Sequence, residues 1–260
     1  MLGTGLGSQP TAESSIFGSN QSLNVDGDGD FVSLPDGLIA AVNKGLVTVS
    51  FWVNLFQNDA SGSQVPFSIF GESTDNQFFV MYHKYYTEWR NTMKTSGDVR
   101  IATYNIPGSG NNDGSGYGLG WQHFVATFNI SGGAYSNKLY RNGVLVGNSA
   151  GASGQSDWVG DVIRVHIGAN GSADGGSAFT DGQIDQVAIW SLELTNSAIS
   201  EIYNNGVMRD LTTVQGANYT SAIIDKLIGY YQFEGNALDS SGNGFHGTLN
   251  GNAGFSTSQP

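Results

Sequence analysis

Hydrophobic and polar residues alternate along most of this chain with a period of two. The longest regular run is residues 47–55, where every second residue is apolar and Trp52 lies on the opposite face. A period of two places successive side chains on opposite faces of a β-strand. The pattern therefore predicts an all-β chain, with further strands at residues 22–25, 30–34, 67–70, 77–90, 121–128, 139–146 and 162–168.

Residues 179–203 combine a strand with a helix. Asp185 has the same phase in the period-two pattern as Val187 and Ile189, so we expect all three to point into the core. The apolar spacing then becomes helical, which predicts one short helix near 197–204. An inward carboxylate at Asp185 requires a cation or several hydrogen-bond donors to offset its lost hydration.

Composition narrows the class of protein. The chain has 260 residues, 12% of them charged, with a net charge of −12 and no cysteine. The negative charge disfavours nucleic acid as a partner, because proteins that bind nucleic acid concentrate Lys and Arg on one face. No stretch approaches the length of a membrane-spanning helix, so we expect no membrane insertion. These features favour a β-sandwich whose stability comes from its core alone.

Four motifs occur in an order that resembles the laminin-G-like jelly rolls of the concanavalin-A-like lectin and glucanase superfamily. Asp-Gly-Asp-Phe-Val follows the first strand, and Trp-Gln-His-Phe-Val-Ala begins at Trp121. A hairpin turns at Asn142-Gly143, and the closing strand reads Asp-Gly-Gln-Ile-Asp-Gln-Val-Ala-Ile-Trp from Asp181. The resemblance implies a jelly-roll sandwich of two antiparallel sheets with one short helix.

The C-terminal segment, residues 227–260, is similar to a segment that usually precedes the first strand in this family. Its aromatic residues alternate with polar ones, which predicts a strand with one buried face. We expect this segment to return and pair beside residues 20–35, within its own chain or in a neighbouring protomer; the alternative is the start of a second module. The predicted organisation is an N-terminal arm at 1–19 and one domain at 20–260, with 227–260 as its returning strand and Gly-rich tail.

Acidic residues suggest a structural calcium ion. Asp26, Asp28 and Asp30 are spaced as in an EF-hand, but that motif requires Gly and Glu where Phe31 and Gly37 stand. The predicted calcium ligands are instead Asp185, Asp30 and Asp26. In the alternative, Asp185 accepts backbone N–H groups from a neighbouring turn.

Catalysis is not expected from the acidic residues. Glycoside hydrolysis requires two carboxyl groups that flank one bond. None of the six glutamates lies two residues from another acid: Glu13, Glu72, Glu88, Glu193, Glu201 and Glu234. We therefore predict a protein that is not an enzyme.

Aromatic residues provide candidate ligand contacts. Tyr85, Tyr86, Trp89 and Trp158 have the ring surfaces that stack on sugars, although most such residues belong to cores or protein contacts.

The whole layout resembles laminin-G-like proteins of marine bacteriophage particles. This implies a non-catalytic virion module located on the phage particle. Its expected partners are other capsid or tail proteins and host-surface glycans, and we expect it to be a homo-oligomer on the particle. The alternative is a carbohydrate-binding lectin module of a cell-surface or secreted protein.

Overall fold

The computed structural model describes most of residues 20–260. The described ranges are 20–42, 45–56, 63–71, 77–83, 88–95, 98–105, 119–131, 134–152, 162–171 and 178–260. Within these ranges no helix is long and apolar enough to cross a membrane.

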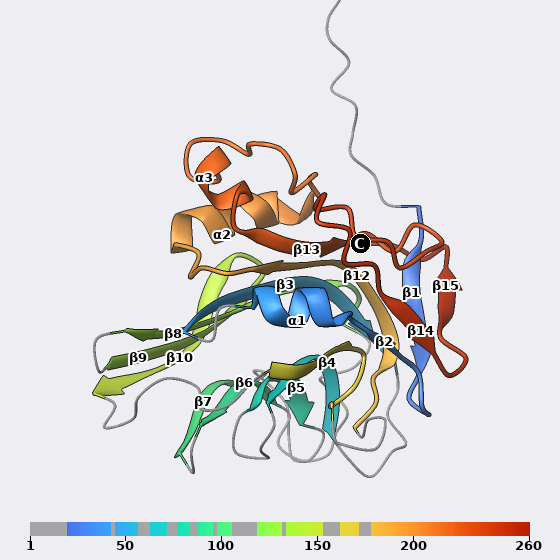
Figure 1. The fold of residues 1–260 in the computed structure, drawn as a ribbon, viewed down its shortest axis with the longest axis horizontal. Coiled ribbons are helices and arrows are strands. Elements are labelled where there is room, and N and C mark those ends of the chain that lie inside the picture. Colours follow the sequence, from blue (N-terminus) through green and yellow to red (C-terminus); the bar gives the residue numbers. More distant parts are fainter. Residues whose placement is uncertain are drawn as a thin grey trace, which may run out of the picture.

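Two antiparallel sheets face each other and form the sandwich (Figure 1). Sheet A runs in the order β10 (Val144–Ala152), β9 (Ala134–Arg141), β8 (Gln122–Ser131), β3 (Leu46–Leu55), β12 (Asp181–Trp190), β1 (Ser22–Asp26) and β15 (Gly254–Ser256), and β13 (Leu227–Tyr231) also pairs with β12. Sheet B runs in the order β14 (Thr248–Asn250), β2 (Phe31–Ser33), β11 (Val162–Ile167), β4 (Ser63–Gly71), β5 (Gln77–His83), β6 (Glu88–Thr95) and β7 (Asp98–Asn105). The predicted all-β jelly-roll sandwich is confirmed.

The main core lies between the two sheets and follows from the period-two pattern. The alternate residues of β3 all belong to it, as do Phe67 and Ile69 of β4. Burial of each such side chain contributes about 1.5–3 kcal/mol to folding. The inward residues of β3 are Val47, Val49, Phe51, Val53 and Leu55.

Helices cover the outer face of sheet A. α2 (Asn196–Tyr203) and α3 (Ser221–Ile224) lie on the side of sheet A that faces away from sheet B (Figure 1). Thr195 caps α2, because its hydroxyl accepts a hydrogen bond from the N–H of Ala198 at 3.2 Å. The predicted helix is present as α2. The described chain also contains α1 (Asp36–Ala41), α3 and a 3-10 turn, η2 (Asn204–Gly206).

A second apolar cluster packs α2, α3 and their flanking residues, which we call the covering layer, against sheet A. Its members come from the outer face of the sheet, from Leu194 and α2, and from residues 211–230. The largest buried side chains in this cluster are Tyr140, Trp190, Tyr219 and Tyr230.

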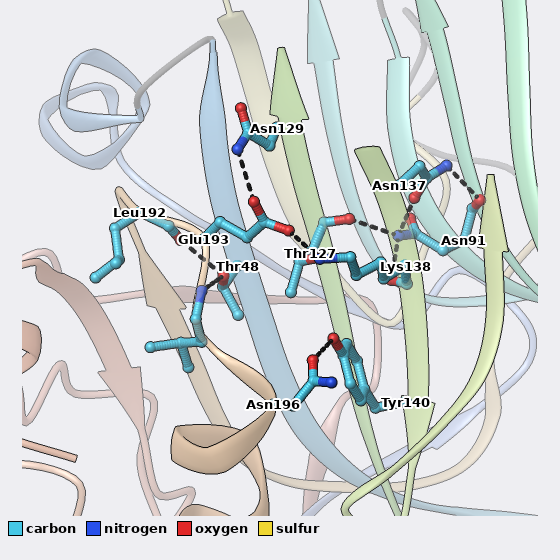
Figure 2. Close-up of polar contacts among 11 residues, drawn as sticks. Thr48, Asn91, Thr127, Asn129, Asn137, Lys138, Tyr140, Leu192, Glu193 and Asn196 are labelled. Atoms are coloured by element: carbon cyan, nitrogen blue, oxygen red, sulfur yellow. Dashed lines mark hydrogen bonds and ion pairs between the residues drawn. The ribbon is translucent and has the colours of Figure 1, made fainter. Parts of the chain in front are cut away.

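Polar contacts fasten the start of this layer to the sheet (Figure 2). Glu193 accepts hydrogen bonds from the Asn129 amide at 2.6 Å and from Lys138 Nζ at 2.7 Å. The Tyr140 hydroxyl donates to Asn196 Oδ1 at 2.6 Å. Elsewhere in Figure 2, Asn91 of sheet B and Asn137 of sheet A hydrogen bond to each other between the two sheets.

The C-terminal segment returns to both sheets. β15 pairs with β1, and β14 pairs with β2, so residues 248–256 lie beside residues 22–33. β13 does not lie there. It pairs with residues 187–190 of β12, because β1 occupies only residues 181–184 of that strand and leaves the rest of the edge open.

Candidate functional site

Asp26, which is exposed, and Asp30, which is buried, lie in a turn that hydrogen bonds to the C-terminal segment. The Asp30 carboxylate accepts the backbone N–H groups of Asn252 and, at 3.3 Å, of Asp26. Asp26 in turn accepts the N–H of Asp28 at 3.0 Å. Burial raises the pKa of Asp30, and the two backbone hydrogen bonds oppose that rise. These carboxylates therefore organise the loop that meets residues 250–253.

Asp185 is fully buried but does not point into the main core. A β-bulge interrupts the pairing of β12 with β3 after Asp185, where Gln186 adopts a positive φ of 51°. The bulge shifts the alternation by one residue, so Ile184 joins Val187 and Ile189 in the main core. This corrects the inward direction expected from the sequence.

On the outer face of sheet A, Asp185 lies under the covering layer. Its Oδ1 accepts the N–H of Gln186 at 2.8 Å. Its charge acts on the Tyr230 hydroxyl, whose pKa is raised mainly by burial and further by Asp210 and Asp185. Tyr230 also donates a hydrogen bond to the Gln186 side chain.

The three predicted calcium ligands do not come together. Asp26 is paired with Asp181, which lies four residues, or about 13 Å, before Asp185 on β12. In the described ranges no group of three His, Cys, Asp or Glu side chains is placed to hold a metal ion. These residues therefore do not fit one shared ion.

Calcium binding stays a prediction with a direct test. A ligand that binds only the folded state raises the melting temperature by mass action. If Asp185 supplies a ligand, added calcium raises the melting temperature of the natural protein and leaves Asp185→Asn unchanged. Equal melting temperatures in calcium and in a chelator would contradict the prediction.

Trp89 belongs to the core. It is 3% exposed and stacks on Phe124, with ring centroids 4.0 Å apart. Its ring is therefore not presented to a ligand. The other predicted contact residues, Tyr85, Tyr86 and Trp158, lie outside the described ranges.

A row of uncharged polar side chains crosses the outer face of sheet A at the end that carries β1 and β15. Asn54 and Gln183 are register partners on β3 and β12, and the Asn54 amide donates to Gln183 Oε1 at 3.2 Å. Trp121 directly precedes Gln122, the partner of Val53. We call Asn54, Gln183 and Trp121 the amide–indole row.

Residues of the C-terminal segment contact this row through their hydroxyl groups. Gln183 Nε2 donates to Ser256 Oγ at 2.8 Å, and Trp121 Nε1 donates to Ser258 Oγ at 3.4 Å. Ser22 Oγ donates to the carbonyl of Ser258 at 2.7 Å. β12 and β3 separate Ser22 from β8 in the sheet, so residues 256–258 lie across the outer face of these strands.

Sequence reasoning missed this row for an identifiable reason. Asn54 lies between two core residues of β3, and Gln183 precedes the core residue Ile184. The alternation therefore contained the signal that both point outward. Their meeting depends on the register of β3 against β12, which one strand's pattern does not reveal.

The fold resembles several solved structures at low sequence identity. A Bacteroides ovatus protein described as carbohydrate-binding has a TM-score of 0.55 and 16% identity, with 91% of this chain and 59% of that chain covered. The CBM40 of the Ruminococcus gnavus IT-sialidase has a TM-score of 0.51 and 11% identity, covering 72% and 100%. The NanB sialidase of Streptococcus pneumoniae has a TM-score of 0.51 and 12% identity, covering 69% and 27%.

Sequence comparison gives the family. None of the curated proteins matches the chain. Residues 26–200 match the laminin G family Laminin_G_3, described as the concanavalin A-like lectin/glucanases superfamily. Because this match covers more than half of the 260 residues, the chain belongs to that family.

Proposed function

We propose that this protein is a non-catalytic carbohydrate-binding module whose ligand site is the amide–indole row. The observation that carries the proposal is the row itself, an indole N–H and two amides on a sheet face beside the sealed covering layer. Amide groups donate to and accept from sugar hydroxyls, and an indole offers an apolar ring with a polar N–H. The family and the carbohydrate-binding proteins of similar fold support this function.

The described glutamates support a binding role over hydrolysis. Glu193 holds Asn129 and Lys138, and Glu201 accepts the backbone N–H groups of residues 217–219. Glu88 pairs with Arg90, and Glu234 accepts the N–H of Asn20. Each described glutamate thus has its own structural partner, and we expect no turnover of glycosides.

A glycan array followed by calorimetry tests the proposal. We expect the natural protein to bind at least one class of glycan. Trp121→Ala and Gln183→Ala should each weaken binding about tenfold, because each removes a donor worth roughly 0.5–1.5 kcal/mol and the indole adds apolar contact.

The exposed residue Val144, on β10 away from the row, supplies the control. Val144→Ala should bind like the natural protein. Absence of glycan binding, or binding by Trp121→Ala and Gln183→Ala as tight as that of the natural protein, would contradict the assignment.

A phage particle is the proposed setting for this activity. The sequence layout supports a virion module that contacts capsid or tail proteins, as a homo-oligomer, while its amide–indole row binds host-surface glycans. The lectin alternative places the same row on a cell-surface or secreted protein. Cryo-microscopy of the source particle distinguishes these settings, since only the first shows copies of the chain on the particle.

A further inference from the structure

Residues 256–258 form a short strap over the amide–indole row. Ser256 is the last residue of β15, so regular strand pairing ends there. Beyond it, Ser258 is held by hydrogen bonds from the Ser22 hydroxyl and the Trp121 indole, and its own N–H donates to Ser256 Oγ at 3.2 Å. Thr257, between the two serines, is exposed.

The strap presents the chemistry of a sugar to the row. Two hydroxyl oxygens, Ser256 Oγ and Ser258 Oγ, accept hydrogen bonds from an amide and an indole N–H. Hydroxyl groups of a saccharide accept from the same donors. We infer that the strap is an internal ligand, and that a neutral saccharide displaces its residues 257 and 258 from the row, while Ser256 stays paired in β15. This inference rests on the proposed function. It adds that the ligand is a neutral saccharide and that the strap competes with it for the row.

Charge around the row favours a neutral ligand over an acidic one. The three side chains of the row carry no charge, so none offers a cation to a sugar carboxylate. On β12, Asp181 lies two residues from Gln183 and therefore on the same face of the sheet. Its register partner on β1 is Asp26, just as Asn24 is the partner of Gln183. Their carboxylates, with a net charge of −12 on the chain, repel anions.

The expected ligand differs from that of a structural relative. The Ruminococcus gnavus module of similar fold, at a TM-score of 0.50 and 12% identity, is described as bound to α2,3-sialyllactose, an anionic glycan. We expect the present chain to bind neutral glycans and to bind sialyllactose more weakly than lactose, the same sugar without the acidic residue.

Residues 257 and 258 of the strap can leave without opening the fold. Its contacts with Trp121 and Ser22 are single hydrogen bonds, and none belongs to the backbone ladder of sheet A. β15 stays paired with β1 when residues 257–260 move away. Displacement therefore costs a few exchangeable hydrogen bonds, each of which water or a sugar hydroxyl replaces.

Three variants measured by calorimetry against one neutral glycan from the array test the inference. Ser258→Ala removes the hydroxyl that accepts from Trp121, and a chain ending at Ser256 removes the rest of the strap. Both should bind about threefold to tenfold more tightly, the factor that corresponds to one net hydrogen bond. Thr257→Ala is the matched control, because its exposed side chain should leave the affinity unchanged.

The outcomes separate the inference from the proposed function. Tighter binding by both strap variants, with Thr257→Ala unchanged, supports the internal ligand. The inference about the strap is wrong if the strap variants bind no more tightly than the natural protein. If Trp121→Ala still binds more weakly than the natural protein in that case, the proposed carbohydrate site is retained. Stronger binding of sialyllactose than of lactose overturns the ligand class. Absence of binding by every form overturns the proposed function and the inference together.

Discussion

Deletion of residues 227–260 is expected to leave a chain that is unfolded or insoluble. The segment pairs with three strands: β13 with β12, β14 with β2 and β15 with β1. Its removal exposes the backbone edges of β1 and β2 and one half of the edge of β12. Unpaired edges of this kind promote aggregation.

The size of the effect follows from the side chains that the deletion removes. Those of β13 and its continuation are at most 9% exposed, apart from Gln232, and each contributes about 1.5–3 kcal/mol on burial. Together they match the typical stability of a whole domain, about 5–15 kcal/mol. The residues concerned are Leu227, Ile228, Tyr230, Tyr231 and Phe233.

Soluble yield and thermal melting of the 1–226 chain measure this effect. A peptide of residues 227–260, expressed in the same cells, is the control, since it should restore soluble protein by supplying the missing strands in trans. In the full-length chain, residues 227–235 should resist proteolysis even after residues 1–19 are removed. A soluble 1–226 chain with an unchanged melting temperature would show that the segment is a separate appendage.

Strands with one apolar face were predictable, but the single strand predicted at 77–90 is two antiparallel strands, β5 and β6, and β7 was not predicted. In β3 the alternation alone identifies every inward residue, and the Asn142-Gly143 turn fixes the β9–β10 hairpin, with positive φ at both positions. Pairing between distant strands was not predictable from alternation. The prediction therefore paired the strand at 227–231 with the wrong strand. Its true position beside β12 depends on how much of that edge β1 leaves open, which only the assembled sheet shows.

Asp185 shows where a periodic pattern fails. Its apparent phase with Val187 and Ile189 is produced by the bulge at Gln186, where a non-glycine residue adopts a left-handed conformation. Few residues other than Gly, Asn and Asp adopt this conformation, so the sequence gives no warning at a glutamine. The prediction of burial for Asp185 is confirmed, but the face is the opposite one.

Acid is expected to destabilise the protein because two histidines are buried in neutral form. His123 is 3% exposed, and its ring lies 5.0 Å from that of Trp52 and 5.7 Å from that of Tyr203. Burial lowers its pKa to about 3. For His166, burial and the nearby charge of Arg164 lower the pKa to about 4.

The direction of the pH effect follows from proton binding. Below a pH of about 6.5 each histidine takes up a proton in the unfolded chain and stays neutral in the folded one. The unfolded state then binds more protons, so stability falls as the pH falls. Each histidine contributes up to about 1.4 kcal/mol per pH unit once it is fully protonated in the unfolded chain, and about 1.6 kcal/mol between pH 6.5 and 5.

Urea denaturation at pH 6.5 and pH 5 measures this loss, which should total about 3 kcal/mol for the natural protein. His123→Gln keeps a side chain able to bond to Ser50 Oγ, which lies 2.8 Å from His123 Nε2, and should remove about half of the pH-dependent loss whatever its own stability. His166→Gln should remove the other half, and the double variant should show a nearly flat response over this window. A loss of the same size in the double variant would assign the acid sensitivity to other groups.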